Sequence, residues 1–264
     1  MITILTIIFF SLGLIIGSFL NVVILRLNTE KSFGGRSACM VCRSQLCWYE
    51  LIPVLSFLFL RGRCRNCKTK ISFQYPLVEL AAGIIFAALF IKFQDVFFFN
   101  DPVAFSLTYA FYAAVFSLLL VVAVYDLKHK IIPDALSCIL GIMAFIGLFF
   151  FSSDNSLLGF SPHIPSTLEF SSGLLIALPF AFFWLVSRGA WMGLGDAKLA
   201  IGLGWLLGLS RSLSGVVLSF WIGAVVGIAL VVFSKKHGMK SEIPFAPYLV
   251  LGTLIAFFFE LHLF

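Results

Sequence analysis

Charged residues are scarce in this sequence. Asp, Glu, Lys and Arg together make up 11% of its 264 residues, whereas about 25% is ordinary for a soluble domain. Hydrophobic residues reach 61%, and the mean hydropathy is +1.08. A composition this poor in charge excludes a soluble enzyme, a disordered protein and a secreted disulfide scaffold. It indicates a polytopic membrane protein.

Several other signals are missing. Residues 1–25 lack a basic n-region, and their apolar run is too long for a cleavable signal, so we interpret them as a retained first helix. The four histidines have no metal-ligand spacing, and no basic soluble domain exists to bind nucleic acid. The glycine-rich segment 193–204 has no preceding strand, which argues against a dinucleotide site. The small residues at 200–208 instead predict close helix packing.

The apolar runs predict about eight transmembrane helices, because one span needs about 20 apolar residues. The predicted spans are 2–25, 76–94, 103–125, 134–152, 168–187, 196–210, 212–233 and 245–263. Polar interruptions lie at 95–102, 152–166, 188–195 and 234–243. We therefore expect an all-α fold in three parts: a first transmembrane helix at 1–25, a loop domain at 26–75 and a membrane-embedded core at 76–264.

Positive charge is nearly absent from every second loop. The loops at 26–75, 126–133, 188–198 and 234–244 hold 16 of the 18 Lys and Arg residues. The positive-inside rule places these loops in the cytoplasm and both termini outside. The same distribution supports the span count, because one missed helix would remove the asymmetry.

The loop at 26–75 carries two Cys-x-x-Cys pairs, formed by Cys39, Cys42, Cys64 and Cys67. Two such pairs at this separation predict a zinc site with four thiolate ligands. Four sulfurs close the tetrahedral coordination of zinc, so we expect a structural site that folds the loop. Redox-active thiols are the alternative interpretation. Cys47 and Cys138 stand apart. We interpret both as packed thiols, with an alternative metal ligand as the other interpretation of Cys47.

Acidic residues in or beside spans are costly and therefore mark candidate sites. Asp126 ends the third predicted span, and Asp196 begins the sixth. Both lie at the cytoplasmic end, where one carboxyl could keep its proton while the other acts as a base. That division of roles is what an aspartic protease needs. The alternatives are an ion pair of Asp126 with Lys128 or Lys130, and a helix cap at Asp196.

Residues around this pair are accessory candidates. Gly193 and Gly195 remove side chains beside Asp196, so another backbone could approach closely. Lys198 follows in the same motif. Asp134 begins the fourth predicted span after Pro133, where an Asp is an ordinary helix cap.

Five motifs in this order resemble those of the bacterial type IV prepilin peptidases, which belong to the GxGD group of membrane aspartic proteases. The motifs are GSFLNVV at 17–23, the segment 48–80, DLKHKIIPD at 126–134, GLGDAKL at 193–199 and PFAPYLVLG at 244–252. The resemblance covers nearly the whole chain. It matches Asp126 and Asp196 to the catalytic pair, and the four loop cysteines to zinc ligands.

The resemblance also implies a function. It implies removal of the basic leader from type IV prepilins or pseudopilins at the cytoplasmic face of the bacterial inner membrane. It further implies methylation of the new N-terminus with S-adenosylmethionine. Glu50 and Glu79 are the candidate polar groups for methyl transfer, or else interfacial partners of Arg61, Arg63 or Arg65.

Three rival functions remain open on the sequence. A transporter with a proton relay predicts polar residues near mid-span, whereas the acids here gather at one face. A non-enzymatic assembly scaffold would use the zinc loop to bind a partner. Another GxGD protease would act on different substrates, although the cysteine loop argues against presenilin-like members.

Overall fold

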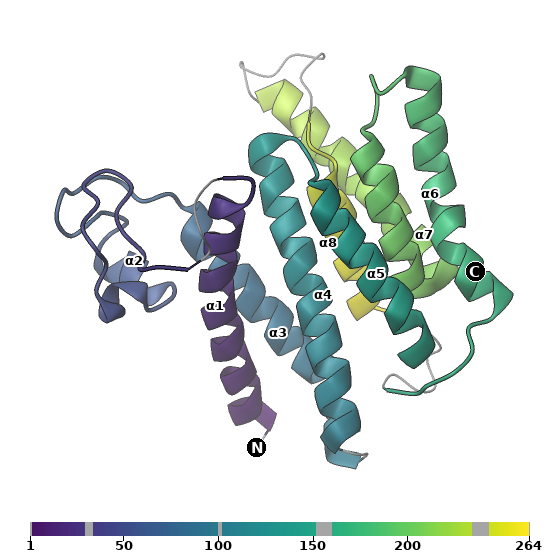
Figure 1. Cartoon of the computed structure of the whole chain (residues 1–264), viewed down its shortest axis with the longest axis horizontal. Helices are drawn as coiled ribbons and strands as arrows, with labels where there is room; N and C mark the ends of the chain where they lie inside the picture. Colours follow the sequence, from purple (N-terminus) through teal and green to yellow (C-terminus); the bar gives the residue numbers. More distant parts are fainter. Residues whose placement is uncertain (1, 30–33, 100–101, 152–159, 234–242, 264) are drawn as a thin grey trace. The chain divides into compact units, whose positions relative to one another are not determined.

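The computed structural model describes residues 2–29, 34–99, 102–151, 160–233 and 243–263, with the backbone alone at 96–99. It divides into two compact units, Met1–Lys92 and Phe93–Phe264. Parts of the polar interruptions predicted at 95–102, 152–166 and 234–243 lie outside the described residues. Every named element in the described ranges is a helix, as Figure 1 shows.

The first unit contains two long apolar helices, α1 (Ile2–Arg26) and α3 (Gln74–Phe99, which runs on into the second unit). They pack closely, because a Cβ at Gly17 would lie 2.7 Å from the Cα atom of Glu79. One turn further on, the Asn21 side chain donates a hydrogen bond to the carbonyl of Tyr75, at 3.1 Å. This close pairing fixes where the chain leaves α1 and where it enters α3.

The segment between α1 and α3 contains only two short helices among its described residues. They are the 3₁₀ turn η1 (Trp48–Leu51) and α2 (Leu55–Phe59). Phe57 of α2 forms a small core for this segment. Its ring lies 5.3 Å from that of Phe73, measured between centroids, and it closes over Gly62.

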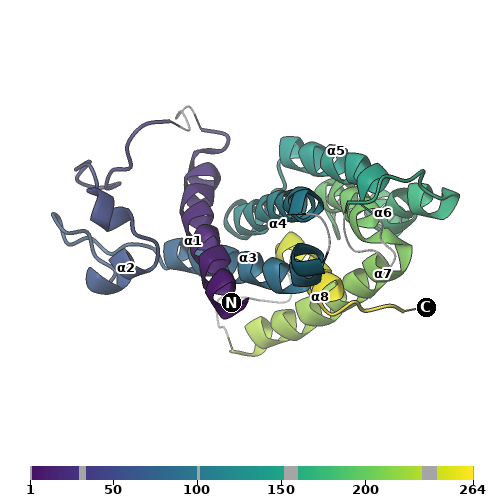
Figure 2. The same cartoon turned by 90° about the horizontal axis from the view of Figure 1, so that it is seen from below.

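Among the described residues of the second unit, five helices follow α3 and pack together as a bundle, shown from two sides in Figures 1 and 2. They are α4 (Pro102–His129), α5 (Asp134–Phe150), α6 (Thr167–Ser187), α7 (Leu194–Phe233) and α8 (Ala246–Phe258). Helix α7 packs against α5, α6 and α8, while α4 packs against α5 and α8. The longest helix of the unit is therefore also its central one.

Glycines allow α7 to approach its neighbours. A Cβ at Gly204 would lie 2.6 Å from the Cα atom of Gly173 in α6, and one at Gly202 would lie 2.9 Å from Leu140 in α5. Gly252 of α8 similarly faces Gly215 and leaves no room for a methyl group. The predicted role of the small residues at 200–208 in helix packing is confirmed.

The predicted spans correspond to helices in the structure. In the part of the chain that the structure describes, five helices are long and apolar enough to cross a membrane, and the shorter α5 and α8 have 17 and 13 residues. Helix α7 has 40 residues and contains one non-helical residue, Gly208, with φ 74°. It therefore contains the two spans predicted at 196–210 and 212–233, separated by a single glycine. The prediction of an all-α polytopic membrane protein is confirmed.

Candidate functional site

Asp126 and Asp196 line the same cavity, which has a volume of about 680 Å³. Asp126 lies in the last turn of α4, and Asp196 lies in the first turn of α7. Their exposed fractions are only 4% and 8%. Because the two residues come from different helices and are buried, they give one cavity a pair of carboxyl groups beside helix ends.

The rest of the cavity wall combines polar and apolar groups. Its polar part includes Lys130, Asp134 and Lys198. Its apolar part includes Ile131, Ile132, Trp191, Met192, Leu194, Phe220, Ile243, Pro244, Phe245 and Tyr248. A large apolar pocket with a few convergent polar groups is typical of a ligand or substrate site.

Two contacts join the segment after α4 to the start of α7. Gly195 packs against Ile132, and a Cβ at Gly195 would lie 3.0 Å from the Cβ atom of Ile132. The Lys198 ammonium pairs with an Asp134 carboxylate oxygen at 2.7 Å. These contacts join the segment that directly follows Asp126 and α4 to the segment that carries Asp196. Asp134 thus has a partner in α7, which its place at a helix start did not indicate.

Backbone groups hold both aspartates. The N–H of Ala246, the first residue of α8, donates to Asp126 Oδ2 at 3.2 Å. At Asp196 the backbone N–H donates to the carbonyl of Gly193, and a Cβ on Gly193 would lie 3.6 Å from Asp196 Oδ2. The hydrogen bond from the Ala246 N–H to Asp126 was not predicted from the sequence. The motif PFAPYLVLG was its only signal, and no side-chain pattern assigns a role to a main-chain N–H.

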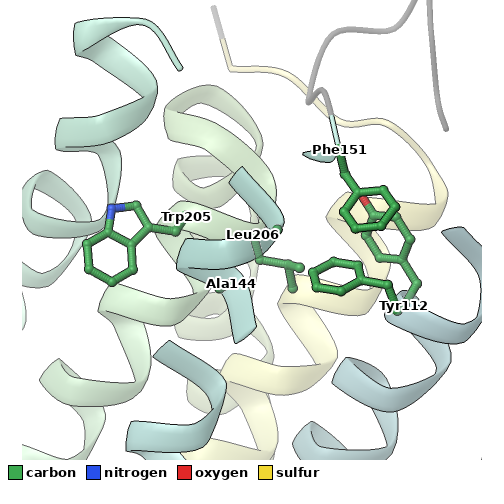
Figure 3. A pocket seen from close by; sticks show the side chains of 7 residues that line it. Tyr112, Ala144, Phe151, Trp205 and Leu206 are labelled. Carbon is green, nitrogen blue, oxygen red and sulfur yellow. The ribbon is translucent and has the colours of Figure 1, made fainter. Parts of the chain in front are cut away.

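A second cavity lies among α4, α5 and α7, as Figure 3 shows. Its volume is about 10 Å³, which suffices for one water molecule. Tyr112, Phe151 and Trp205 are among the residues that line it. This space is too small for a peptide, so the aspartate cavity remains the candidate site.

The four predicted zinc ligands gather in the first unit. Their Sγ atoms all lie within 4.8 Å of one another. The Sγ atoms of Cys39 and Cys67 are 3.7 Å apart, and those of Cys42 and Cys64 are 4.0 Å apart. Zn–S bonds of about 2.3 Å in a tetrahedron put sulfurs about 3.8 Å apart, so the four thiols fit Zn²⁺. A disulfide needs about 2.05 Å and is not formed.

The two cysteine pairs have the same backbone structure, which occurs twice in the loop. In the first, Cys39 N–H donates to Ser44 O, and Arg43 N–H donates to Cys39 O. In the second, Cys64 N–H donates to Thr69 O, and Lys68 N–H donates to Cys64 O. Arg43 and Lys68 both have positive φ, at 55° and 59°. The sequence showed no clear repeat, because only the cysteines and a hydroxyl residue recur.

That hydroxyl residue contacts a thiol in each half. Ser44 Oγ lies 3.0 Å from Cys42 Sγ, and Thr69 Oγ1 lies 3.2 Å from Cys67 Sγ. Hydrogen bonds from the Ser44 hydroxyl and backbone N–H lower the pKa of Cys42 to about 6. Thr69 lowers the pKa of Cys67 in the same way. Since zinc binds thiolates, both contacts favour the form that the metal requires.

Glu50 and Glu79 belong to the first unit, whereas the residues that line the aspartate cavity belong to the second. Glu50 accepts a hydrogen bond from the N–H of Cys47 at 2.7 Å and so caps η1. Glu79 is buried in α3 and accepts a hydrogen bond from the N–H of Val54 at 2.7 Å. Both carboxylates therefore bind backbone groups of the segment between α1 and α3.

Two family models match the chain. Residues 11–93 match the Bacterial Peptidase A24 N-terminal domain, and residues 113–228 match the Type IV leader peptidase family. The first range covers the cysteine segment, and the second contains Asp126 and Asp196. No solved structure matches the chain.

The chain is also similar to proteins named prepilin leader peptidase/N-methyltransferase. The one from Bacillus subtilis is 34% identical over 96% of this chain and 93% of its own length. The one from Aeromonas hydrophila is 33% identical, covering 94% of this chain and 88% of the relative. With the Myxococcus xanthus protein the identity is 37% over 88% of this chain, which spans 65% of that relative's length. On its motifs, its fold and these similarities, the chain belongs to the type IV leader peptidase family of membrane enzymes.

Proposed function

We propose that this protein removes the leader peptide from prepilins or pseudopilins, with Asp126 and Asp196 as its catalytic pair. The observation that carries the proposal is that these two carboxyl groups, far apart in the chain and on different helices, line one cavity. Membership of the family and the names of the relatives support the substrate class.

The reaction needs one ionised and one protonated carboxyl group. The ionised aspartate takes a proton from water as the water oxygen attacks the scissile carbonyl carbon. The protonated aspartate gives its proton to the amide nitrogen as the C–N bond breaks. The Ala246 N–H holds one oxygen of Asp126, which leaves the other oxygen for the water. Two carboxyls that share this task titrate as a unit.

Four further residues position this pair. Gly193 leaves space beside the Asp196 carboxyl, and Gly195 lets the segment after α4 approach the start of α7. Asp134 and Lys198 join the same two segments through their ion pair. We assign these residues to positioning, because they act through the two aspartates.

The catalytic face and the zinc loop are proposed to be cytoplasmic, with both termini outside the inner membrane. The distribution of Lys and Arg supports this orientation, since 16 of 18 fall in one set of loops. In functional terms we divide the chain into a first span at 1–25, the zinc loop at 26–75 and the peptidase core at 76–264. The substrate's apolar helix would reach the core sideways through the lipid.

Zinc is proposed to be structural. The thiols Cys39, Cys42, Cys64 and Cys67 would hold it, and four sulfurs leave no position for water. Its contribution is to fix the loop, whose described part otherwise has only the small core around Phe57. No step of peptide-bond cleavage passes through this metal.

Methylation of the new N-terminus is the second proposed activity, with Glu50 and Glu79 as the candidate residues. S-adenosylmethionine, when bound, supplies a methyl group to an amine. Its cationic sulfonium suits hydrogen-bond acceptors, and the first unit buries the Glu79 carboxylate and Asn21 Oδ1, the latter without a hydrogen-bond partner. Glu79 is the stronger candidate, because its side chain is buried in α3, whereas Glu50 is partly exposed.

A cleavage assay in liposomes tests both activities. A prepilin is incubated with wild type, Asp126→Asn, Asp196→Asn or the control Asp95→Asn, whose carboxylate is exposed in α3. We expect wild type and the control to remove the leader, and both site variants to lose at least about 10³-fold in rate. With S-adenosylmethionine, the product mass should rise by about 14 Da, the mass of one methyl group replacing one hydrogen.

Full activity in both site variants would contradict the catalytic pair. An intact prepilin with correctly folded wild type would instead favour a different substrate or the scaffold function. A product that gains no mass would remove the methylation proposal and leave the peptidase proposal standing. Glu79→Gln then separates the two activities, since it should lower the gain in mass without slowing cleavage.

A further inference from the structure

Helix α2 presents an apolar face away from its own unit. Leu55, Leu58 and Phe59 have exposed fractions of 51%, 63% and 83%. Their i, i+3, i+4 spacing places all three on one side of the helix. Phe57 points the other way, because its ring packs against Phe73 and Gly62. Helix α2 therefore has an inner face that packs through Phe57 and an outer apolar face that is exposed.

This helix is attached directly to a membrane span. Val54, the residue before α2, donates its N–H to Glu79 Oε2 at 2.7 Å. Glu79 is the sixth residue of α3, about 8 Å along the axis from the first, and lies within the span Gln74–Asp95. Val54 has a φ of 60°, unusual for a β-branched residue, so the backbone is held in a strained form to make this contact.

The attachment sets the depth of α2. A helix that starts beside the second turn of a transmembrane helix lies at the level of the membrane surface and not far out in water. In Figure 1, α2 lies to the side of α1 and not beyond its last turn. The face formed by Leu55, Leu58 and Phe59 is thus placed where lipid is available.

Charge next to α2 is complementary to a phospholipid surface. Arg61 and Arg63 follow shortly after Phe59, and both are exposed. Between residues 36 and 73 the sequence has seven basic residues and one acidic residue. Four thiolates and a zinc ion would still leave this segment positive. A basic segment beside an apolar face is typical of helices that lie in the headgroup region.

The geometry points to α2 as an interfacial membrane helix that binds anionic phospholipid. Leu55, Leu58 and Phe59 enter the boundary between headgroups and acyl chains, and Arg61 and Arg63 bind lipid phosphates. The occupant is lipid because the helix is tethered to a span at bilayer depth by a main-chain hydrogen bond. In this arrangement the membrane surface supports the zinc loop from one side.

Photocrosslinking in nanodiscs tests this inference on the full chain. The photoreactive residue p-benzoylphenylalanine replaces Phe59 in one variant and Phe57 in the other, and the adducts are identified by mass spectrometry. We expect lipid adducts from position 59 and internal adducts from position 57, the matched control on the opposite face of the same helix. Zinc content measured in each variant verifies that the loop has folded.

The identity of the lipid tests the charged part. In bilayers of equal phosphatidylglycerol and phosphatidylcholine, we expect adducts at position 59 to favour the anionic lipid at least about twofold. Arg61→Gln combined with Arg63→Gln should abolish that preference. Adducts at position 59 with a second copy, with another segment of the chain or with no lipid at all would overturn the inference. An unchanged preference in the double variant would overturn the role of the arginines.

Discussion

In the zinc loop each pair of ligands belongs to one short Cys-x-x-Cys turn, whereas the two aspartates of the cavity come from different helices far apart in the chain. Each half of the cysteine site is one local turn, and the same turn occurs twice in the loop. The cavity has no such local unit. Its two carboxyl groups line one cavity because α4, α5, α7 and α8 pack in one arrangement. The two sites should therefore fail in different ways.

Removal of zinc is expected to have the largest effect, and to affect only one of the two regions. Structural zinc supplies much of the folding free energy of small domains, so a chelator should unfold the segment around residues 38–70. Hydrogen exchange there should accelerate at least about 100-fold, while exchange in α4 to α8 stays unchanged. Adding zinc back should restore protection. Equal acceleration in both regions would show that the cavity also depends on the metal.

The helix bundle should instead be sensitive to small increases in volume. Gly252→Ala places a methyl group against the backbone of Gly215, so we expect a loss of about 2–3 kcal/mol in unfolding free energy. Gly141 in α5 has open space around it, and Gly141→Ala should stabilise the protein by up to about 1 kcal/mol. Thermal unfolding in detergent distinguishes the two. Equal shifts for both variants would contradict close packing of α7 with α8.

Loss of the ion pair between Lys198 and Asp134 should have a smaller effect on stability than the added methyl group at Gly252. Both partners are partly exposed, so Lys198→Met should lower stability by less than about 1 kcal/mol. Cleavage should fall by about fivefold, because the segments carrying the two aspartates lose one of their two contacts. Asp134→Asn should have the same effect, and the double variant should add nothing further. Additive losses would mean that the two residues act separately.

The smallest effect should come from the hydroxyls beside the thiols. Ser44→Ala removes one hydrogen bond to Cys42, worth about 1 kcal/mol, so zinc affinity should fall about fivefold. Thr69→Ala should match it, because Thr69 occupies the equivalent position in the second half. Competition with a chromophoric chelator measures both, and Ser44→Thr should restore the affinity. Unequal effects would show that the two halves are alike in backbone only.

The sequence predicted most of what depends on neighbouring residues. Cysteine spacing identified the four thiols that gather in the structure, and hydropathy located the helices. It also placed two spans on either side of residue 211, where the structure has a single helix interrupted at Gly208. A glycine with positive φ turns the chain without any polar residue, so hydropathy alone places the boundary only approximately.

Contacts between distant segments could not be predicted in the same way. Asp134 at a helix start was compatible with a cap, and its pairing with Lys198 became visible only with α5 and α7 in place. The outward face of α2 was hidden for a different reason. The helix Leu55–Phe59 is too short to show a period, and its neighbours in the chain are also apolar. The packing of the Phe57 ring against Phe73 distinguishes the two faces.

The hydrogen bond from Ala246 to Asp126 has a consequence for how this site changes over evolutionary time. Its donor belongs to the main chain, and every amino acid except proline carries the same N–H. Substitutions at position 246 are therefore limited by available volume and not by hydrogen-bonding chemistry. A set of homologous sequences would record this contact only as the avoidance of proline, at one position between Pro244 and Pro247.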